Sequence, residues 1–270
     1  MKICCLMDNE ARDGFACEHG LSLWIEANGR SILFDSGESG AFAENAARLG
    51  IDLGRADAAV LSHGHYDHSG GMARFFELNG AARLYARRGA RRAHWSLGTG
   101  KMRYIGLSDE LRESGRLTEL NGDFELYEGM MLFGGVHGGE LISAANSVLL
   151  DEDQRTVDTF EHEQSLLIEE NGRQTLIAGC AHRGIINIME RAKALSGRSA
   201  DVVIGGFHLA IPGTDELDAE LVDAVGERLA AEPGTIYYTG HCTGRPSYER
   251  LKLRLGDRLH PLDSGDVLDI

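Results

Sequence analysis

Runs of apolar residues, each closed by glycine or a polar turn, divide the first third of the chain into short strands. Residues 21–26 alternate in the manner of a half-buried strand, Asn28-Gly29 favours a hairpin turn, and residues 31–34 form the returning strand. The apolar run 58–61 predicts a buried strand. Apolar residues at helical spacing predict helices at 41–49 and 72–78.

The last third of the chain alternates strands with helices, which predicts an α/β fold. A hairpin is expected around Asn171-Gly172, and longer apolar-periodic segments follow it. The predicted strands are 165–168, 175–178, 200–204 and 235–238, and the predicted helices are 185–195 and 216–230.

Three of these strands end in the same way, with a short glycine-containing turn that carries a histidine. The turns are Gly179–His182, Gly205–His208 and Gly240–Cys242. Ligand sites of open α/β sheets lie beyond the carboxyl ends of strands, and glycine lets the backbone turn sharply there. We therefore expect these three histidines to share one site.

A fourth histidine turn, residues 62–70, follows the apolar run 58–61 and reads Ser-His-Gly-His-Tyr-Asp-His-Ser-Gly. Packing does not require three imidazoles and a carboxylate within six positions, because such groups are costly to bury unpaired. Histidine nitrogen and aspartate oxygen are ligands that zinc prefers. The turn therefore predicts a metal centre, and its spacing directs ligands to two neighbouring points.

We assign His63, His65 and His182 to one metal ion, since three histidines with an open fourth position are typical of catalytic zinc. Asp67, His68 and His241 belong to a second, with Asp67 also orienting the attacking water. Two ions about 3.5–4 Å apart would share that water. The expected cofactor is zinc, two ions per chain, with iron or manganese as alternatives.

Three further residues keep two interpretations each. Asp35 ends a neighbouring strand and is either a carboxylate that holds His65 or an ordinary turn residue. His208 either contacts the substrate and gives a proton to the leaving group, or is a hydrogen-bonded structural histidine. Cys180 is either a thiolate ligand or a small buried apolar residue.

The remaining histidines are weaker candidates. His162 is the rival of His182, but the flanking Glu161 and Glu163 indicate a solvated loop. His19 either lines the pocket or caps a strand. Surface or structural roles are expected for the others, which are His94, His137 and His260.

Composition narrows the class of partner. The net charge of −15 disfavours nucleic acid, whose phosphates require a basic surface. The basic run 83–92 is a solvated helix face or the lining of a pocket for an anionic group. Five cysteines, two of them adjacent, fit a reducing compartment, and no apolar run is long enough to span a bilayer. We expect a cytoplasmic protein with a small-molecule substrate, anionic or phosphorylated as one option, and a homo-oligomer is left open.

The histidine turn 62–68 resembles the signature of the metallo-β-lactamase superfamily. The chain is similar to one branch of it, the 7,8-dihydropterin-6-methyl-4-(β-D-ribofuranosyl)aminobenzene-5′-phosphate synthases and related metal-dependent hydrolases. The segments that carry this resemblance are 18–22, 33–37, 62–71, 179–185, 205–209 and 241–244.

The resemblance implies a four-layer αββα sandwich formed by a single domain over residues 1–270, with the site at one edge. We expect residues 80–135 to be an insertion or lid over the pocket. Members of this superfamily carry a bridging aspartate in a Gly-Asp turn where this chain has Gly179-Cys180, so Cys180 either replaces it or the second ion binds weakly. The resemblance also disfavours diiron flavoprotein relatives, which carry Glu in place of His65.

Three functions follow as expectations. The first is a metal-dependent hydrolase in which a metal-bound hydroxide attacks an ester, lactone or phosphoester. The second is a transferase in which an arylamine displaces pyrophosphate from a pterin methyl carbon. The third is a non-catalytic ligand sensor, or a structural site, which needs only four closed ligands.

Overall fold

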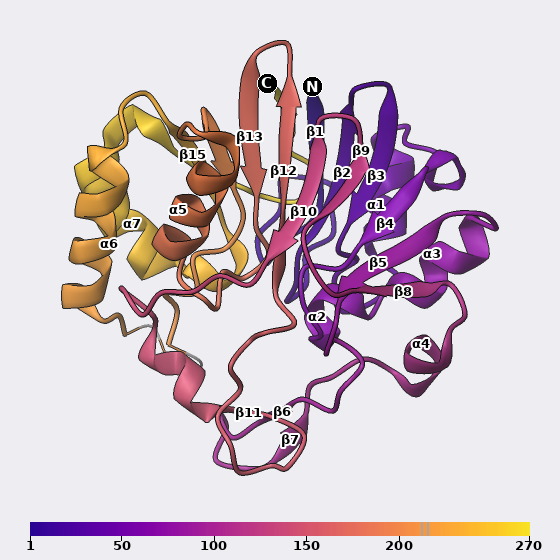
Figure 1. Cartoon of the computed structure of the whole chain (residues 1–270), viewed down its shortest axis with the longest axis horizontal. Coiled ribbons are helices and arrows are strands. Elements are labelled where there is room, and N and C mark those ends of the chain that lie inside the picture. The colour runs from indigo at the N-terminus through magenta and orange to yellow at the C-terminus, as the bar shows by residue number, and fades with distance from the viewer. Residues whose placement is uncertain (212, 215) are drawn as a thin grey trace.

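Two seven-stranded sheets pack face to face, and helices cover their outer faces (Figure 1). This computed structural model describes residues 1–211, 213–214 and 216–270. The arrangement is the four-layer αββα sandwich that the sequence led us to expect. In the described residues, no helix combines the length and apolar character that crossing a membrane requires.

The first sheet comes mainly from the N-terminal half of the chain. Its first strands form an antiparallel meander, and from β3 onward neighbouring strands run parallel. Helices α1 (Phe42–Arg48) and α3 (Met72–Leu78) cover its outer face. In spatial order the strands are β17 (Val267–Asp269), β1 (Lys2–Met7), β2 (Ser22–Ala27), β3 (Arg30–Phe34), β4 (Ala58–Val60), β5 (Arg83–Arg87) and β8 (Leu117–Leu120).

The second sheet comes from the C-terminal half, and four of its strands, from β13 to β16, are mutually parallel. Helices α5 (Ile185–Ser196), α6 (Ala219–Ala231) and α7 (Arg245–Leu255) cover it. In spatial order the strands are β16 (Leu259–Pro261), β15 (Ile236–Thr239), β14 (Val202–Ile204), β13 (Arg173–Ile177), β12 (Gln164–Glu170), β10 (Met130–Gly134) and β9 (Phe124–Tyr127).

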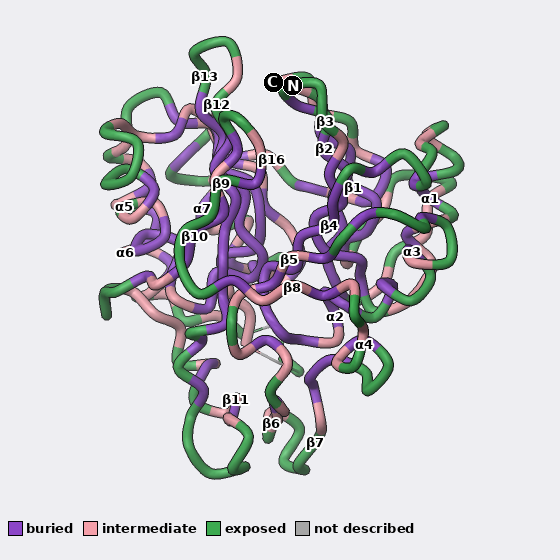
Figure 2. Tube along the Cα trace, turned by 45° about the vertical axis from the view of Figure 1, so that its right-hand side comes forward, coloured by how far each residue is buried: buried purple, intermediate pink, exposed green. Residues whose placement is uncertain are grey.

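Strand alternation divides the buried apolar residues into three layers. In β1, Ile3 and Cys5 pack between the two sheets, whereas Cys4 and Leu6 pack against the outer helices. The same alternation in the other strands gives one core between the sheets and one under each helix layer. Burial is accordingly concentrated along the strands (Figure 2). These rigid layers fix where each strand ends, and therefore where the site lies.

Residues 80–135, expected to be an insertion, are mostly part of the sandwich. Strands β5 and β8 belong to the first sheet, and β9 and β10 to the second. The segment separate from both is a small three-stranded sheet at the same end of the molecule as the short helix α2 (Tyr66–Ser69) (Figure 1). Its strands are β6 (Trp95–Ser96), β7 (Arg103–Tyr104) and β11 (Leu149–Leu150).

Candidate metal centre

The histidine turn lies directly after β4 and contains the four-residue helix α2 (Tyr66–Ser69). His65 has extended backbone at the start of this helix, so His63 and His65 precede the helical turn while Asp67 and His68 lie within it. All four side chains are at least nine-tenths buried. The local chain thus presents its ligand candidates in two pairs, as the spacing predicted.

The three strand-end turns meet this one across the space between the sheets. Strands β13, β14 and β15 are parallel neighbours, so their carboxyl ends lie at one edge. Ala181, His208 and His241 all have positive φ, at 59°, 49° and 44°. Non-glycine residues adopt this conformation at a cost, and it is concentrated at functional sites. The strain marks the three turns that carry His182, His208 and His241.

The first predicted set of ligands is assembled. His63 Nε2 lies 3.0 Å from His65 Nδ1 and 3.3 Å from His182 Nε2. A tetrahedral zinc ion with Zn–N distances of 2.0–2.1 Å separates its nitrogens by about 3.3–3.4 Å. The three imidazoles therefore fit around one such ion.

Hydrogen bonds at the other ring nitrogens fix which nitrogen is free. The Nδ1–H of His63 donates to Ser62 Oγ at 2.9 Å, and the Nδ1–H of His182 donates to Asn146 Oδ1 at 3.1 Å. Both Nε2 atoms then carry lone pairs that face each other with no proton between them. Burial, together with the neighbouring imidazoles, holds the pKa of His63 and of His182 well below its ordinary value. Neutral, converging lone pairs of this kind are able to hold a cation.

The second predicted set of ligands is also brought together, and the sulfur atom of Cys180 lies beside it. His68 Nε2 lies 3.6 Å from Asp67 Oδ2 and 3.1 Å from Cys180 Sγ, while His241 Nε2 is 3.4 Å from the same Asp67 oxygen. Asn9 Oδ1 accepts the Nδ1–H of His241 at 2.9 Å. Asp67, His68, Cys180 and His241 form a second group able to hold a cation.

Asp35 is a supporting carboxylate, but for a different histidine from the one we predicted. Its Oδ2 accepts the Nδ1–H of His68 at 2.7 Å, not a proton of His65. Its Oδ1 accepts the backbone N–H of Ser62, also at 2.7 Å. The prediction chose the wrong partner because the α2 turn rotates His68, rather than His65, toward the end of β3.

Asp67 is the charged centre of the second set. Burial alone would raise its pKa, but the imidazoles of His68, His241 and His19 hold the pKa far below its ordinary value. For His241, burial acts to lower the pKa, yet the Asp67 carboxylate prevails and the result is a rise to about 9. Without a metal ion, Asp67 and His241 therefore form an ion pair, whose proton an incoming cation would displace.

Cys180 lies between the two sets, because its Sγ is also within 4.8 Å of a ring nitrogen of His182 and one of His208. Burial raises the pKa of its thiol well above the ordinary value, so only an adjacent cation would make it a thiolate. His208 is 4.1 Å from His182 between ring centroids, and neither of its ring nitrogens has a hydrogen-bond partner in the described part of the chain. A structural histidine would have such a partner, so the geometry favours the functional interpretation of His208.

Most of the candidate donor residues line a cavity of about 360 Å³, namely His65, Asp67, Cys180, His182 and His241. Arg103 of β7 also faces it, and its guanidinium donates to the hydroxyl of Tyr66 at 2.8 Å. The basic run 83–92 does not reach this cavity: Arg87, Arg88 and Arg92 line a separate one of about 400 Å³. The anion contact available at the metal centre is Arg103, which the sequence analysis missed.

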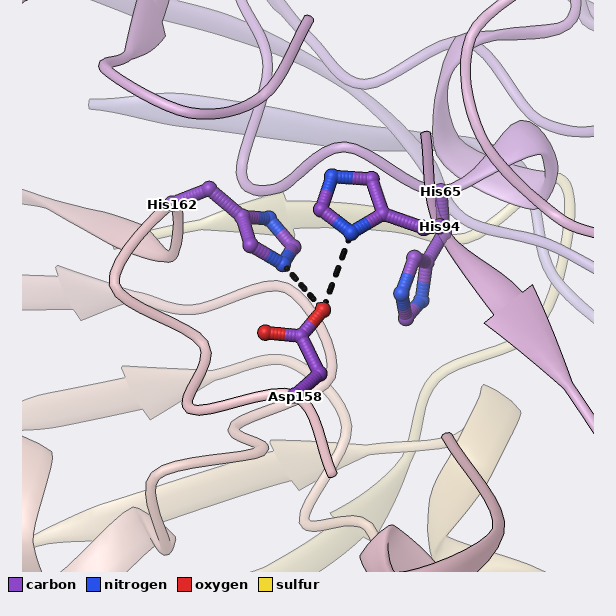
Figure 3. A group of neighbouring side chains, drawn as sticks. All are labelled: His65, His94, Asp158 and His162. Atoms are coloured by element: carbon purple, nitrogen blue, oxygen red, sulfur yellow. Dashed lines mark hydrogen bonds and ion pairs between the residues drawn. The ribbon is translucent and has the colours of Figure 1, made fainter. Parts of the chain in front are cut away.

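His94 and His162 are buried beside His65 rather than solvated, together with Asp158 (Figure 3). His162 does not join His182 among the ligands, because its Nδ1 accepts the backbone N–H of Gly64 at 2.9 Å. Sequence reasoning missed this cluster and the amides Asn9 and Asn146. Their loops have no periodicity, and the one available signal was an excess of histidine.

A family model described as the metallo-beta-lactamase superfamily matches residues 16–241, which is most of the chain. The chain belongs to the metallo-beta-lactamase superfamily. This superfamily is composed mostly of metal-dependent hydrolases. The matched region contains the turn 62–68 and ends at His241, so it includes both sets of ligands.

Two relatives come from Methanocaldococcus jannaschii. The uncharacterised protein MJ0448 is 31% identical over 211 residues, covering 76% of this chain and 78% of its own length. A protein named 7,8-dihydropterin-6-methyl-4-(beta-D-ribofuranosyl)-aminobenzene-5'-phosphate synthase is 28% identical over 274 residues, covering 94% and 90%.

Among solved structures, Tm1679, described as a metal-dependent hydrolase of the beta-lactamase superfamily, superposes with a TM-score of 0.83. It is 27% identical, and the match covers 100% of this chain and 99% of Tm1679. The zinc-bound PqqB of Methylobacterium extorquens shares the fold at a TM-score of 0.56, with 15% identity and full coverage of both chains. The superfamily assignment and the donor geometry both indicate a metal-binding site.

Proposed function

We propose that this protein is a metal-dependent hydrolase acting on a small ester, lactone or phosphoester. The observation that supports this most directly is the convergence of unprotonated His63 Nε2 and His182 Nε2 at 3.3 Å, beside a cavity that His182 lines and that a small molecule can enter. A structural site would be closed by its ligands, whereas catalytic sites keep an open position.

Bound zinc would supply Lewis acidity and lower the pKa of a water molecule to about 7. Two side chains of the protein supply the other groups that the reaction needs. The ionised Asp67 faces the cavity and orients the attacking water by accepting its hydrogen bond. His208 faces the cavity with both ring nitrogens free, so it donates a proton to the leaving oxygen.

The lining of the cavity suggests the class of substrate. Arg103 is the cation that a carboxylate or phosphate of the substrate would meet, and Thr99 adds a hydroxyl. Ile105, Leu149 and Ile211 provide apolar surface. We expect a small anionic molecule with an apolar body.

A second candidate is a transferase, favoured by the similarity to the synthase over 94% of this chain. In that reaction an arylamine nitrogen would form a bond to a pterin methyl carbon as pyrophosphate leaves. The same cations would then hold the pyrophosphate.

Both functions are tested with protein purified without added metal, then loaded with zinc. Esters, lactones and phosphoesters form one panel, and a pterin diphosphate with an arylamine forms the other. Hydrolysis should disappear with a chelator and fall at least about 100-fold in Asp67→Asn. Asp109→Asn, which changes an exposed carboxylate in α4 (Asp109–Glu113), is the matched control and should keep full activity.

The outcomes separate the candidates. Turnover on the second panel alone would replace the hydrolase by the transferase. Ligand binding without turnover on either panel would leave a sensor, and hydrolysis unaffected by metal removal would refute the proposal.

A further inference from the structure

His65 has a second ring nitrogen that the metal centre does not use. Its Nδ1 faces His63 and His182, while its Nε2 is buried and has no hydrogen-bond partner among the residues described. When Nδ1 binds a metal ion, the ring proton must be on Nε2. A buried N–H of this kind normally finds an acceptor, and metal-bound histidines almost always donate theirs.

The neighbouring cluster of His94, Asp158 and His162 has its protons fixed by its hydrogen bonds (Figure 3). Gly64 N–H donates to His162 Nδ1, so the proton of His162 is on Nε2 and is donated to Asp158 Oδ2 at 3.0 Å. The Nδ1–H of His94 donates to the same oxygen at 2.9 Å. Asp158 Oδ1 accepts the backbone N–H of Phe160 at 2.7 Å.

These bonds argue against a further cation inside the cluster. His162 has no lone pair left, and both oxygens of Asp158 already accept hydrogen bonds of normal length. One atom remains unsatisfied, the Nε2 of His94, which is buried and carries a lone pair. His94 Nε2 is therefore an acceptor that lacks a donor. It belongs to the same group of side chains as His65, whose Nε2–H is a donor that lacks an acceptor.

Packing keeps His94 against the ligand turn. Its side chain is 1% exposed, and its ring centroid is 5.7 Å from that of His65 in an edge-on arrangement. Its Nε2 would be only 2.8 Å from a Cβ at Gly64, the residue between the two ligands His63 and His65. Because His162 accepts the backbone N–H of Gly64 as well, both histidines of this cluster lie against the turn.

We propose that His94 is a positioning residue for the metal ligand His65. Its Nε2 accepts the Nε2–H of His65, directly or through one buried water, while Asp158 holds the His94 ring and His162 ties Asp158 to Gly64. This inference rests on the proposed function, in which His65 binds the metal. Such outer partners orient the ligand and raise its basicity, and losing one typically costs 10–100-fold in metal affinity.

The test compares zinc affinity, measured by chelator competition, in the wild type and three variants. His94→Phe removes the acceptor and should weaken zinc binding about 10–100-fold. His94→Gln places an amide oxygen near the position of Nε2 and should restore part of the loss. His137→Phe removes an exposed histidine that, like His94, lines the separate cavity of about 400 Å³, and it should leave zinc affinity unchanged. Cobalt-loaded His94→Phe should also show a shifted visible spectrum.

A second measurement needs neither metal nor variant. In the metal-free wild type, nitrogen NMR of the histidine rings should find His94 protonated on Nδ1 and bare on Nε2. A predominantly Nε2-protonated His94 would overturn the inference, even if His94→Phe failed to fold. Wild-type zinc affinity retained in folded His94→Phe would overturn it and leave the hydrolase intact. A wild type that binds no divalent ion would refute both.

Discussion

At the scale of single residues, hydrogen bonds to the outer ring nitrogens of the histidines orient their inner nitrogens toward the metal centre. Ser62, Asn146 and Asp35 each accept the remote N–H of one histidine and thereby free its other nitrogen. The tautomers of His63, His182 and His68 are therefore set by the protein before any metal ion arrives. Preorganisation of this kind lowers the cost of binding, since the side chains lose little freedom when the ion enters.

We expect Cys180 to decide how many ions the centre holds. Its sulfur groups with Asp67, His68 and His241 and also with His182 and His208, so in Cys180→Ala the metal content should fall from two ions per chain to one. Cys180→Asp should keep two, because a carboxylate can also bridge. Elemental analysis of protein dialysed against equal zinc measures this, with the exposed Cys17→Ala as control. Two ions retained in Cys180→Ala would show that the sulfur is not a ligand.

The residues that the structure brings together were readable from the sequence as candidate ligands, and their supporting residues were not. His63, His65 and His68 share one turn, and His182 and His241 follow apolar strands, so local pattern indicated them. Asn146 lies in a short 3-10 helix 36 residues before His182, and Asp158 lies in a loop 64 residues after His94. Only the tertiary structure brings these two residues close to the histidines that they hydrogen-bond. An Asn or Asp outside regular structure is common in turns, so its presence alone does not indicate such a role.

At the scale of elements, the site depends on how closely two strand ends approach. Gly179, after β13, packs against Ser62, after β4, so closely that a Cβ would overlap the serine hydroxyl. This contact joins the two sheets where His63 and His182 meet. Glycine is required here for space rather than for backbone conformation.

Gly179→Ala should therefore separate the two halves of the centre. We expect a loss of about 1–3 kcal/mol in the free energy of unfolding from overpacking, together with weaker zinc binding. Gly80→Ala is the matched control, since a Cβ there meets no atom within 4 Å. Denaturant unfolding and chelator competition measure the two effects, and equal behaviour of both variants would contradict the packing argument.

Element prediction succeeded where apolar periodicity was strong and failed elsewhere. Helix α3 was predicted at its observed bounds, whereas α7 was missed because Leu251 and Leu255 are its only buried apolar residues. Residues 80–135 were expected to be an insertion, although they include β5 and β8 of the first sheet. Arginines interrupt that region, yet their side chains lie at the surface while Leu84 and Leu117 enter the core.

At the scale of the whole molecule, the metal centre links the two sheets. The turn after β4 supplies one group of ligands, and the turns after β13 and β15 supply the other. Any ion bound by both groups stabilises the packed sandwich relative to the unfolded chain.

Metal removal should therefore lower the melting temperature. At a free zinc concentration 100 times Kd, binding adds about 2.7 kcal/mol, which corresponds to roughly 5–10 °C for a chain of this size. Calorimetry before and after chelation measures the shift, and restored zinc should reverse it. An unchanged melting temperature would mean that the ion does not bridge the two halves.

The separation of the ligands along the chain also sets the order of events during biosynthesis. His63 leaves the ribosome 119 residues before His182, the partner with which it would grip an ion. A nascent N-terminal half lacks the second group of proposed ligands, which lies in the turns after β13 and β15. We therefore expect the metal ion to enter only after these later turns have been synthesised, so that cellular metal supply acts on a chain whose synthesis is already complete.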